Sequence, residues 1–246
     1  MAEMKAVILS ICPEANIVDI SHGIEKFNIR MGAFVLACAA PYFPKDTIHV
    51  AVVDPGVGTK RKPILIRTKQ ACFIGPDNGI LALAAGRKDT EPVYEIANKK
   101  LIMSQASNTF HGRDIFASAA AHLAKGTLPT EFGQEIREIV TPSFAKIVRK
   151  KDVLIGEVIH IDDFGNVITN FREKELELAK AENVINIEHR KTKLTFKRRR
   201  AYADAGKHQP MALIGSHRFL EISLNQGNAA KHFKIRNGDQ IIVCHS

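Results

Sequence analysis

The sequence predicts an α/β protein with two parts: a layered α/β domain with a mostly parallel sheet, then an antiparallel β-barrel-like domain. Strand-like and helical segments alternate over residues 1–145, which is typical of a layered sheet with parallel pairs. After 141–143, strand-like runs follow one another with almost no helix. A chain of 246 residues with 45% hydrophobic residues can bury a sizeable core. We therefore expect two domains, 1–148 and 149–246.

In the first domain, each predicted element follows from a local pattern. Asn28 can cap a helix that Pro41 stops, and a β-branched run predicts a buried central strand. Gly126 stands where a glycine ends a helix. The predicted elements are strands 6–11 and 16–20, a helix over 29–40, a strand over 47–53, a hairpin of 63–67 and 71–74, and helices over 81–85 and 113–124.

The second domain is predicted to consist almost entirely of antiparallel strands. Short apolar or alternating runs are separated there by turn residues, as in small barrels and sandwiches. The expected strands are 153–161, 166–170, 184–188, 194–198, 211–214, 220–224 and 240–243, with one helix over 173–181.

Whole-chain properties exclude several classes of protein. The longest apolar run, 33–40, is far below the ~18–20 residues of a membrane helix. The first residues lack the pattern of a secretory leader, so we expect a cytoplasmic protein. The four cysteines contain no CxxC pair, which predicts reduced thiols and no metal site.

The net charge of +9 leaves a second function class open, a nucleic-acid-binding module. Much of this charge lies in residues 189–200, where Phe196 interleaves with basic residues and Tyr202 follows. Such a segment could bind phosphates and stack on bases. Because charge runs more often form a solvated surface, nucleic acid is not the partner we expect.

Two segments of the first domain could carry chemistry. The loop Asp54-Pro55-Gly56-Val57-Gly58 follows the predicted strand 47–53, where α/β sheets bind ligands, and its glycines let main-chain amides approach a small molecule. An ordinary Pro-Gly turn has the same pattern. His111 stands at the start of the predicted helix 113–124, where the helix dipole disfavours the imidazolium form, so it could accept a proton. The alternative is a histidine that only caps the helix.

Two segments of the second domain could bind a ligand. Asp162-Asp163-Phe164-Gly165-Asn166 combines carboxylates for a cation with an aromatic ring that can stack on a base, although a plain β-turn has the same composition. Gly215-Ser216-His217-Arg218 and the segment 225–230 offer main-chain hydrogen bonds to a heterocycle.

Together these segments resemble one family, the S-adenosylmethionine hydroxide adenosyltransferases, relatives of the adenosyl fluoride and chloride synthases. The stretches that carry the resemblance are "VVDPGVGTKR", "GPDNGIL", "NTFHGRDIF", "IDDFGNVITN" and "GSHRFLEISLNQGNAA", and they extend over nearly the whole chain. The resemblance implies hydrolysis of S-adenosyl-L-methionine at ribose C5′, giving adenosine and L-methionine, with no cofactor or metal. It also implies a homotrimer whose sites lie between one subunit's first domain and its neighbour's second.

The resemblance implies a role for each matching residue. Asp54, Arg61 and His111 match the catalytic set of the hydrolases. Asp162 and Ser216 would hold the methionine end, with His217 beside them. Asn166 and the main chain around Asn228 and Ala229 would hold adenine, and Phe27 would lie against the ribose. Because the halide-forming relatives replace the aspartate, Asp54 implies water as the nucleophile; halide transfer at the same site is the alternative. The long extra loop of the fluoride-forming enzymes is not evident.

The chemistry of the substrate agrees with these roles. The sulfonium leaves as a neutral thioether and needs no acid, so the enzyme must align a water behind C5′, which can be worth ~7–11 kcal/mol. We expect Asp54 and His111 to orient and deprotonate this water while Arg61 stabilises the developing hydroxide.

One departure from the family concerns the start of the chain. The family begins with a strand ending in a "TTDFG"-like segment whose aspartate binds the ribose, whereas "MAEMKAVILSICP" matches the stretch that follows it. We therefore expect a missing first strand and a less stable first domain. We attribute the difference to a start codon assigned too late; the alternative is a truncated, poorly active member of the family.

Overall fold

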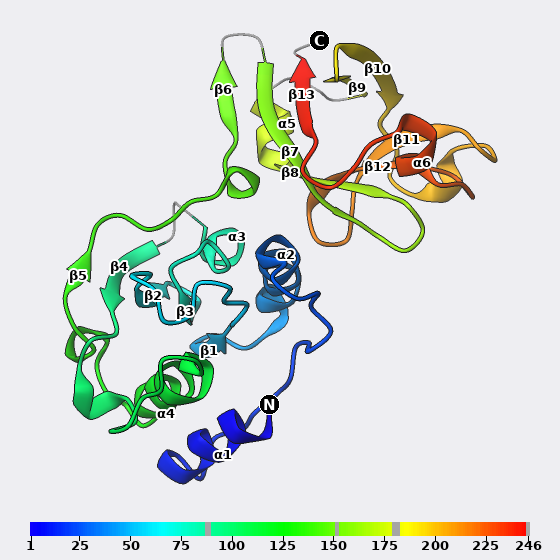
Figure 1. Ribbon diagram of the computed structural model, residues 1–246. Coiled ribbons are helices and arrows are strands. Elements are labelled where there is room, and N and C mark those ends of the chain that lie inside the picture. Colours follow the sequence, from blue (N-terminus) through cyan, green and yellow to red (C-terminus); the bar gives the residue numbers. More distant parts are fainter. Residues whose placement is uncertain (87–89, 151–152, 179–182, 245–246) are drawn as a thin grey trace. The chain divides into compact units, whose positions relative to one another are not determined.

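The computed structural model describes residues 1–86, 90–150, 153–178 and 183–244, without the side chains of 90, 91 and 178 (Figure 1). The chain divides into two compact units, Met1–Pro142 and Ser143–Ser246, and each is described by itself. The predicted domain boundary at 148 lies just beyond this division and stays a prediction.

The first unit contains a five-stranded sheet in the order β1-β3-β2-β4-β5. Its strands are β1 (Thr47–Val50), β2 (Pro63–Thr68), β3 (Ala71–Pro76), β4 (Thr90–Glu95) and β5 (Glu135–Ile136). Its α-helices are α1 (Ala2–Ile11), α2 (Ile29–Ala39), α3 (Ala82–Ala85) and α4 (Ser118–Ala124). The α/β class predicted for this part of the chain is confirmed.

Strand direction in this sheet is mixed. The predicted parallel pairing is found between β1 and β3, with Thr47 opposite Ala71. The pairs β3–β2, β2–β4 and β4–β5 are antiparallel. The reason is clearest for β2 and β3, the predicted hairpin, because the connection between Thr68 and Ala71 is too short for a parallel crossover. The Thr68 hydroxyl closes this turn by donating to the carbonyl of Ala71 at 2.9 Å.

Two faces of the sheet carry two different hydrophobic clusters. Ile64 and Ile66 of β2 pack in one cluster with Leu36 of α2, whereas Leu65 between them packs in the other with Phe116. This is the alternation that a strand buried on both faces requires. The first unit is therefore layered, as predicted, with helices on both sides of the sheet.

Both strands predicted before residue 21 were wrong. Residues 6–11 are the second half of α1, and 16–20 form no strand. Short apolar runs do not distinguish helix from strand. None of the residues of α1 is buried, so it is a surface helix. Two ion pairs hold it in place: Glu3 pairs with Arg113 at 2.7 Å, and Lys5 pairs with Asp19 at 2.5 Å.

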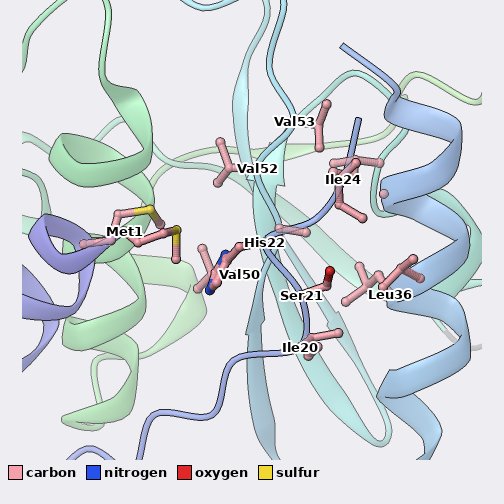
Figure 2. Close-up of a pocket in the computed structure, with 14 residues that line it drawn as sticks. Met1, Ile20, Ser21, His22, Ile24, Leu36, Val50, Val52 and Val53 are labelled. Carbon is pink, nitrogen blue, oxygen red and sulfur yellow. The ribbon is translucent and has the colours of Figure 1, made fainter. Parts of the chain in front are cut away.

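In the described part of the chain, β1 forms one edge of the sheet. Within the described ranges, β1 pairs with β3 alone. The other side of β1 faces α1 and residues 20–24, and a cavity of about 150 Å³ lies between them and α2. Figure 2 shows Val50, Val52 and Val53 on the strand side of this cavity and Leu36 on the α2 side.

The helix predicted after Asn28 is confirmed as α2. The Asn28 side chain accepts the N–H of Met31 at 2.9 Å, which satisfies one of the free donors at the start of a helix. A Cβ at Gly32 would lie 3.1 Å from side-chain atoms of both Ile80 and Val53, so α2 packs closely on the segment that leads to Asp54.

The second unit is an antiparallel, nearly closed barrel in the strand order β10-β9-β13-β7-β8-β12-β11, with β6 also paired to β7. Its strands are β6 (Val148–Lys150), β7 (Val153–Ile161), β8 (Val167–Arg172), β9 (Val184–His189), β10 (Thr192–Lys197), β11 (Pro210–Ile214), β12 (Phe219–Leu224) and β13 (Gln240–Cys244). Its α-helices are α5 (Glu173–Leu178) and α6 (Ala229–Phe233). The predicted barrel-like class is confirmed.

Contacts beyond the ends of the strands close the barrel. Arg198 forms a bridge with Ala212, and the Arg199 N–H donates to the Ala212 carbonyl at 2.9 Å, so the end of β10 meets β11. Phe171, Phe196 and Ile222 lie in the core that the strands enclose. Among the helices that the structure describes, none is long and apolar enough to cross a membrane.

Candidate active site

Asp54 begins the loop that leaves the sheet after β1. The main chain still follows β3 at Ala51, whose N–H donates to the Ile74 carbonyl at 3.0 Å. The Asn78 side chain then donates to the Val53 carbonyl at 2.8 Å. Asn78 belongs to the "GPDNGIL" stretch, so this stretch fixes the main chain directly before Asp54.

Asp54, Arg61 and His111 lie together in the first unit. The Arg61 guanidinium donates from Nε to Asp54 Oδ1 at 3.0 Å and from Nη2 to Asp54 Oδ2. The same Nη2 lies 2.6 Å from His111 Nδ1. The Asp54 and Arg61 side chains are 5% and 9% exposed, so this ion pair is shielded from water.

One nitrogen of the Arg61 guanidinium, Nη1, takes no part in these contacts. Its Nη1 atom is buried and has no partner within the described part of the chain. The guanidinium carbon lies 5.4 Å from the centre of the Phe116 ring, which holds the group in place from one side. A buried donor without a partner costs about 1–3 kcal/mol, so a bound water or ligand oxygen at Nη1 would be stabilised.

His111 directly precedes the π-helical turn Gly112–Ala117, which α4 continues. The predicted helix is therefore present, and His111 stands at its start as expected. Burial and then the Arg61 charge lower the pKa of His111, while Asp54 and Asp114 oppose them with smaller effects. The expectation of a neutral imidazole agrees with this direction, and the two largest causes are burial and the Arg61 charge.

The four residues that precede β8 form one hydrogen-bonded turn around Asp162. Asp162 Oδ1 accepts the N–H groups of Phe164 at 3.0 Å and Asn166 at 2.8 Å, and Oδ2 accepts the Asn166 side-chain amide at 2.9 Å. Asn166 is buried, whereas the Phe164 ring is 80% exposed. The predicted turn is thus built by Asp162 itself and presents an aromatic ring to its surroundings.

Gly165 joins this turn to the start of α6, where Asn228 and Ala229 lie. A Cβ at Gly165 would lie 2.1 Å from the Asn228 side chain, and its φ of +87° also favours glycine. The Ala230 N–H donates to the Gly165 carbonyl at 2.9 Å. Asn228 accepts the Lys231 N–H at 2.8 Å and so caps α6, a helix that the sequence did not predict. The structure therefore brings together Asp162, Asn166, Asn228 and Ala229.

Ser216 and His217 form an exposed turn between β11 and β12. The Gly215 N–H donates to the Phe219 carbonyl at 2.9 Å and closes the turn. Strand pairing places Phe219 opposite Arg172, while Val167, next to the Asp162 turn, lies opposite Ile222. The Ser216 turn and the Asp162 turn are therefore at opposite ends of β8.

Phe27 lies in the loop before α2, with a φ of +66° and 73% of its surface exposed. No contact that would place its ring against another site residue is described. Its suggested role against the ribose stays a prediction.

The basic segment 189–200 differs from what a base-stacking surface needs. Phe196, the aromatic residue interleaved with its charges, is 1% exposed and packs edge-on against Phe233 at 5.2 Å. It is therefore part of the core and cannot stack on a base. The described residues also contain no group of three or more metal-binding side chains.

Comparison with known proteins places the chain in a family. Residues 1–133 match the SAM hydroxide adenosyltransferase N-terminal domain, and 156–242 match the C-terminal domain. A protein named (R)-S-adenosyl-L-methionine hydrolase from Methanocaldococcus jannaschii is 36% identical, over 98% of this chain and 89% of that protein. A fluorinase from Actinoplanes sp. is 29% identical over 73% of this chain and 69% of its own length.

The crystal structure of an uncharacterized conserved protein from Thermotoga maritima superimposes with a TM-score of 0.83 at 36% identity, over 99% of this chain and 94% of that one. The chain belongs to the SAM hydroxide adenosyltransferase family.

Proposed function

We propose that this protein hydrolyses S-adenosyl-L-methionine at ribose C5′, giving adenosine and L-methionine. The observation that carries the proposal is that Asp54 and Arg61, from one loop, form a shielded cluster with His111, which lies 50 residues beyond Arg61 in the sequence. Because the relative from M. jannaschii is named for the (R)-epimer, we propose the (R)-epimer at sulfur as the substrate.

The geometry supports a specific division of roles. A guanidinium has N–H donors and no acceptor, so the Nη2–H of Arg61 must donate to His111 Nδ1. The proton of the neutral imidazole is then on Nε2, which makes His111 a donor that orients the oxygen of the water. Each Asp54 oxygen keeps a lone pair beyond its bond to Arg61, so Asp54 is the proposed proton acceptor. Arg61 Nη1 would stabilise the developing hydroxide.

The second unit is proposed to bind the two ends of the substrate. Asn166 and the main chain of Asn228 and Ala229 would hold adenine, with the exposed Phe164 ring stacked on it. Asp162, Ser216 and His217 would lie at the methionine end, and Phe27 of the first unit at the ribose.

The test is incubation of the purified protein with each sulfur epimer separately in H₂¹⁸O, followed by mass spectrometry. Adenosine that carries ¹⁸O at its 5′ oxygen, with equimolar methionine, is the expected product of the (R)-epimer. Release without the label would contradict water attack at C5′. Added chloride or fluoride tests the alternative that the fluorinase relative suggests, since halide transfer would give a 5′-halo nucleoside.

We further propose a cytoplasmic homotrimer with each site built between subunits. The substrate is an intracellular methyl donor, and within the described residues none of the four cysteines forms a disulfide, as in reducing compartments. Light scattering after size-exclusion chromatography tests the trimer, and fractionation of the producing cells tests the location. We propose that nucleic acid is not a partner of this protein. Retention of the protein on RNA at low salt would contradict this statement.

A further inference from the structure

Asp114 is a fully buried carboxylate that the proposed mechanism does not use. It lies three residues beyond His111 in the π-helical turn Gly112–Ala117, and its side chain is 0% exposed. Burying a carboxylate costs free energy unless hydrogen bonds satisfy its oxygens. Each oxygen of Asp114 has such a partner, and both partners belong to the chain around His111.

Oδ2 of Asp114 fixes the loop that leads to His111. The Ser107 N–H donates to Oδ2 at 2.7 Å, and the Ser107 hydroxyl oxygen accepts the Phe110 N–H at 3.0 Å. The Phe110 carbonyl in turn accepts the Asp114 N–H at 3.1 Å. These bonds join Asp114 to both ends of the segment 107–110. Because Phe110 directly precedes His111, they also determine where the His111 main chain lies.

Oδ1 of Asp114 holds the same segment through a side chain. Arg113 Nε donates to Oδ1 at 2.6 Å, and the Arg113 guanidinium carbon lies 4.9 Å from the centre of the Phe110 ring. The same guanidinium donates from Nη1 to Glu3 at 2.7 Å. Arg113 is therefore fixed by two carboxylates while it covers Phe110. The residue before His111 is thus held by its main chain and by its ring.

This arrangement needs the charge of Asp114. Burial raises the pKa of Asp114, but hydrogen bonds from Arg113 and Ser107 together lower it by more, so the carboxylate is ionised at neutral pH. An amide in its place would have one acceptor oxygen for two donors, and its NH₂ group would face either the Ser107 N–H or Arg113. Loss of the charge should therefore release one of these two contacts.

We propose that Asp114 is a positioning residue for hydrolysis, because it places His111 within hydrogen-bonding distance of Arg61. This inference rests on the proposed function and deepens it. His111 Nδ1 lies 2.6 Å from Arg61 Nη2, and that bond fixes which imidazole nitrogen can orient the water. Asp114 acts through His111 and contacts neither the substrate nor the water. A displacement of about 1 Å at a reacting group can cost about 100-fold in rate.

Asp114→Asn tests the proposal, because it removes the charge and keeps the size of the side chain. We expect kcat to fall about 10- to 100-fold while KM for S-adenosylmethionine changes about threefold or less. In the His111→Ala background the same replacement should lower single-turnover release of adenosine about threefold or less, since an effect that acts through His111 is lost with it. Crystal structures should show Arg61 Nη2 and His111 Nδ1 about 1 Å or more farther apart in Asp114→Asn than in the wild type.

Asp239→Asn is the matched control. Asp239 is a partly buried carboxylate of the second unit, and it accepts hydrogen bonds from Arg190 and from the Arg236 N–H. Its replacement should lower the free energy of unfolding, as that of Asp114 should, but leave kcat unchanged. Equal falls in kcat in the two variants would overturn the inference, because a loss of stability would then explain both.

A folded Asp114→Asn variant with wild-type kcat would also overturn it, as would an equal fall in the His111→Ala background or an unchanged Arg61–His111 distance. Should Asp114→Asn fail to fold, Ser107→Ala decides, because it removes only the hydroxyl that accepts the Phe110 N–H. We expect kcat to fall about three- to tenfold in Ser107→Ala with KM unchanged. An unchanged kcat there would count against Asp114 as well. If the wild type released no adenosine from either epimer, the proposed function would fail, and the crystal structures alone would test the placement of His111.

Discussion

Gly58 and Asn108 are in direct main-chain contact, since a Cβ at Gly58 would lie 2.7 Å from the Asn108 carbonyl oxygen. Gly58 lies in the loop between Asp54 and Arg61, and Asn108 lies three residues before His111. The φ of Gly58 is +78°, a conformation that other residues adopt only under strain. The contact therefore holds the two loops at the distance that the Arg61–His111 hydrogen bond requires.

Gly58→Ala should separate these loops. We expect kcat to fall at least tenfold and the free energy of unfolding to fall by about 1–3 kcal/mol. Gly126→Ala is the control, because Gly126 has a φ of +96° but nothing within 4 Å of the added Cβ. Kinetics and urea unfolding of both variants separate the effect of backbone strain from the loss of the Gly58–Asn108 contact. Equal activity in the two variants would show that this contact does not position the site.

Asp54→Asn should remove the proton acceptor while preserving the shape of the side chain. We expect a fall in kcat of about 10²–10⁴-fold, the usual contribution of a general base. Asp46→Asn is a suitable control, since Asp46 is exposed and its φ of +66° suits asparagine. Single-turnover release of adenosine is the measurement, and near-normal release by Asp54→Asn would reject the role.

His49 should make the first unit less stable in mild acid. It is 3% exposed, stacks on Phe73 and has a buried Nε2 without a partner among the described residues. Burial lowers the pKa of His49 in the folded protein. The unfolded chain therefore binds more protons below its ordinary value of about 6.5, and stability falls as the pH drops through that value. The slope of the free energy of unfolding against pH approaches about 1.4 kcal/mol per pH unit.

Replacing His49 by leucine should remove this part of the pH dependence. Urea unfolding at pH 7.5 and 5.5 measures it: the wild type should lose more stability between the two pH values than the variant. An equal loss in both proteins would show that other groups cause the dependence.

Gly165→Ala should disturb substrate binding more than chemistry. The added Cβ would displace the Asn228 side chain and strain a φ of +87°. We expect KM for S-adenosylmethionine to rise at least tenfold with a smaller change in kcat, because Asp54, Arg61 and His111 lie in the other unit. Steady-state kinetics are the check, and a loss confined to kcat would contradict the assignment.

Phe164→Ala should weaken adenosine binding without affecting stability, because the ring is 80% exposed. Stacking of an aromatic ring on a base is worth about 1–3 kcal/mol, which corresponds to roughly 5- to 150-fold in affinity. Leu128→Ala, at a residue 61% exposed in the first unit, is the control. Calorimetry measures the affinity for adenosine, and an unchanged affinity would show that Phe164 does not contact adenine.

Local patterns predicted the elements that local interactions determine. The α2 helix begins at the capping residue Asn28, and the Thr68–Ala71 connection gives the expected hairpin. The strands β7 to β13 of the second unit were also found, because alternating burial is visible in the sequence, whereas the short β6 was not predicted. By contrast, α1 was missed because its helix depends on partners far along the chain, such as Arg113.

The candidate site was predictable only in part. Resemblance identified Asp54, Arg61 and His111, but their mutual hydrogen bonds, and therefore the tautomer of His111, depend on tertiary geometry. Asn166 was inside a recognised stretch, yet nothing local indicates that its side chain is buried. The close approach of Gly165 to Asn228 likewise joins segments that are far apart in the sequence.

The π-helical turn Gly112–Ala117 makes the position of His111 sensitive to chain length. Wide turns of this kind hold one residue more than an α-helical turn, often at functional sites. Deletion of one residue in this turn would let the helix continue as a regular α-helix. The residues before the turn, including His111, would then rotate by about 100° about the helix axis. His111 would then point away from Arg61 although no site residue had been replaced, so a one-residue deletion could end catalysis in a protein that still folds.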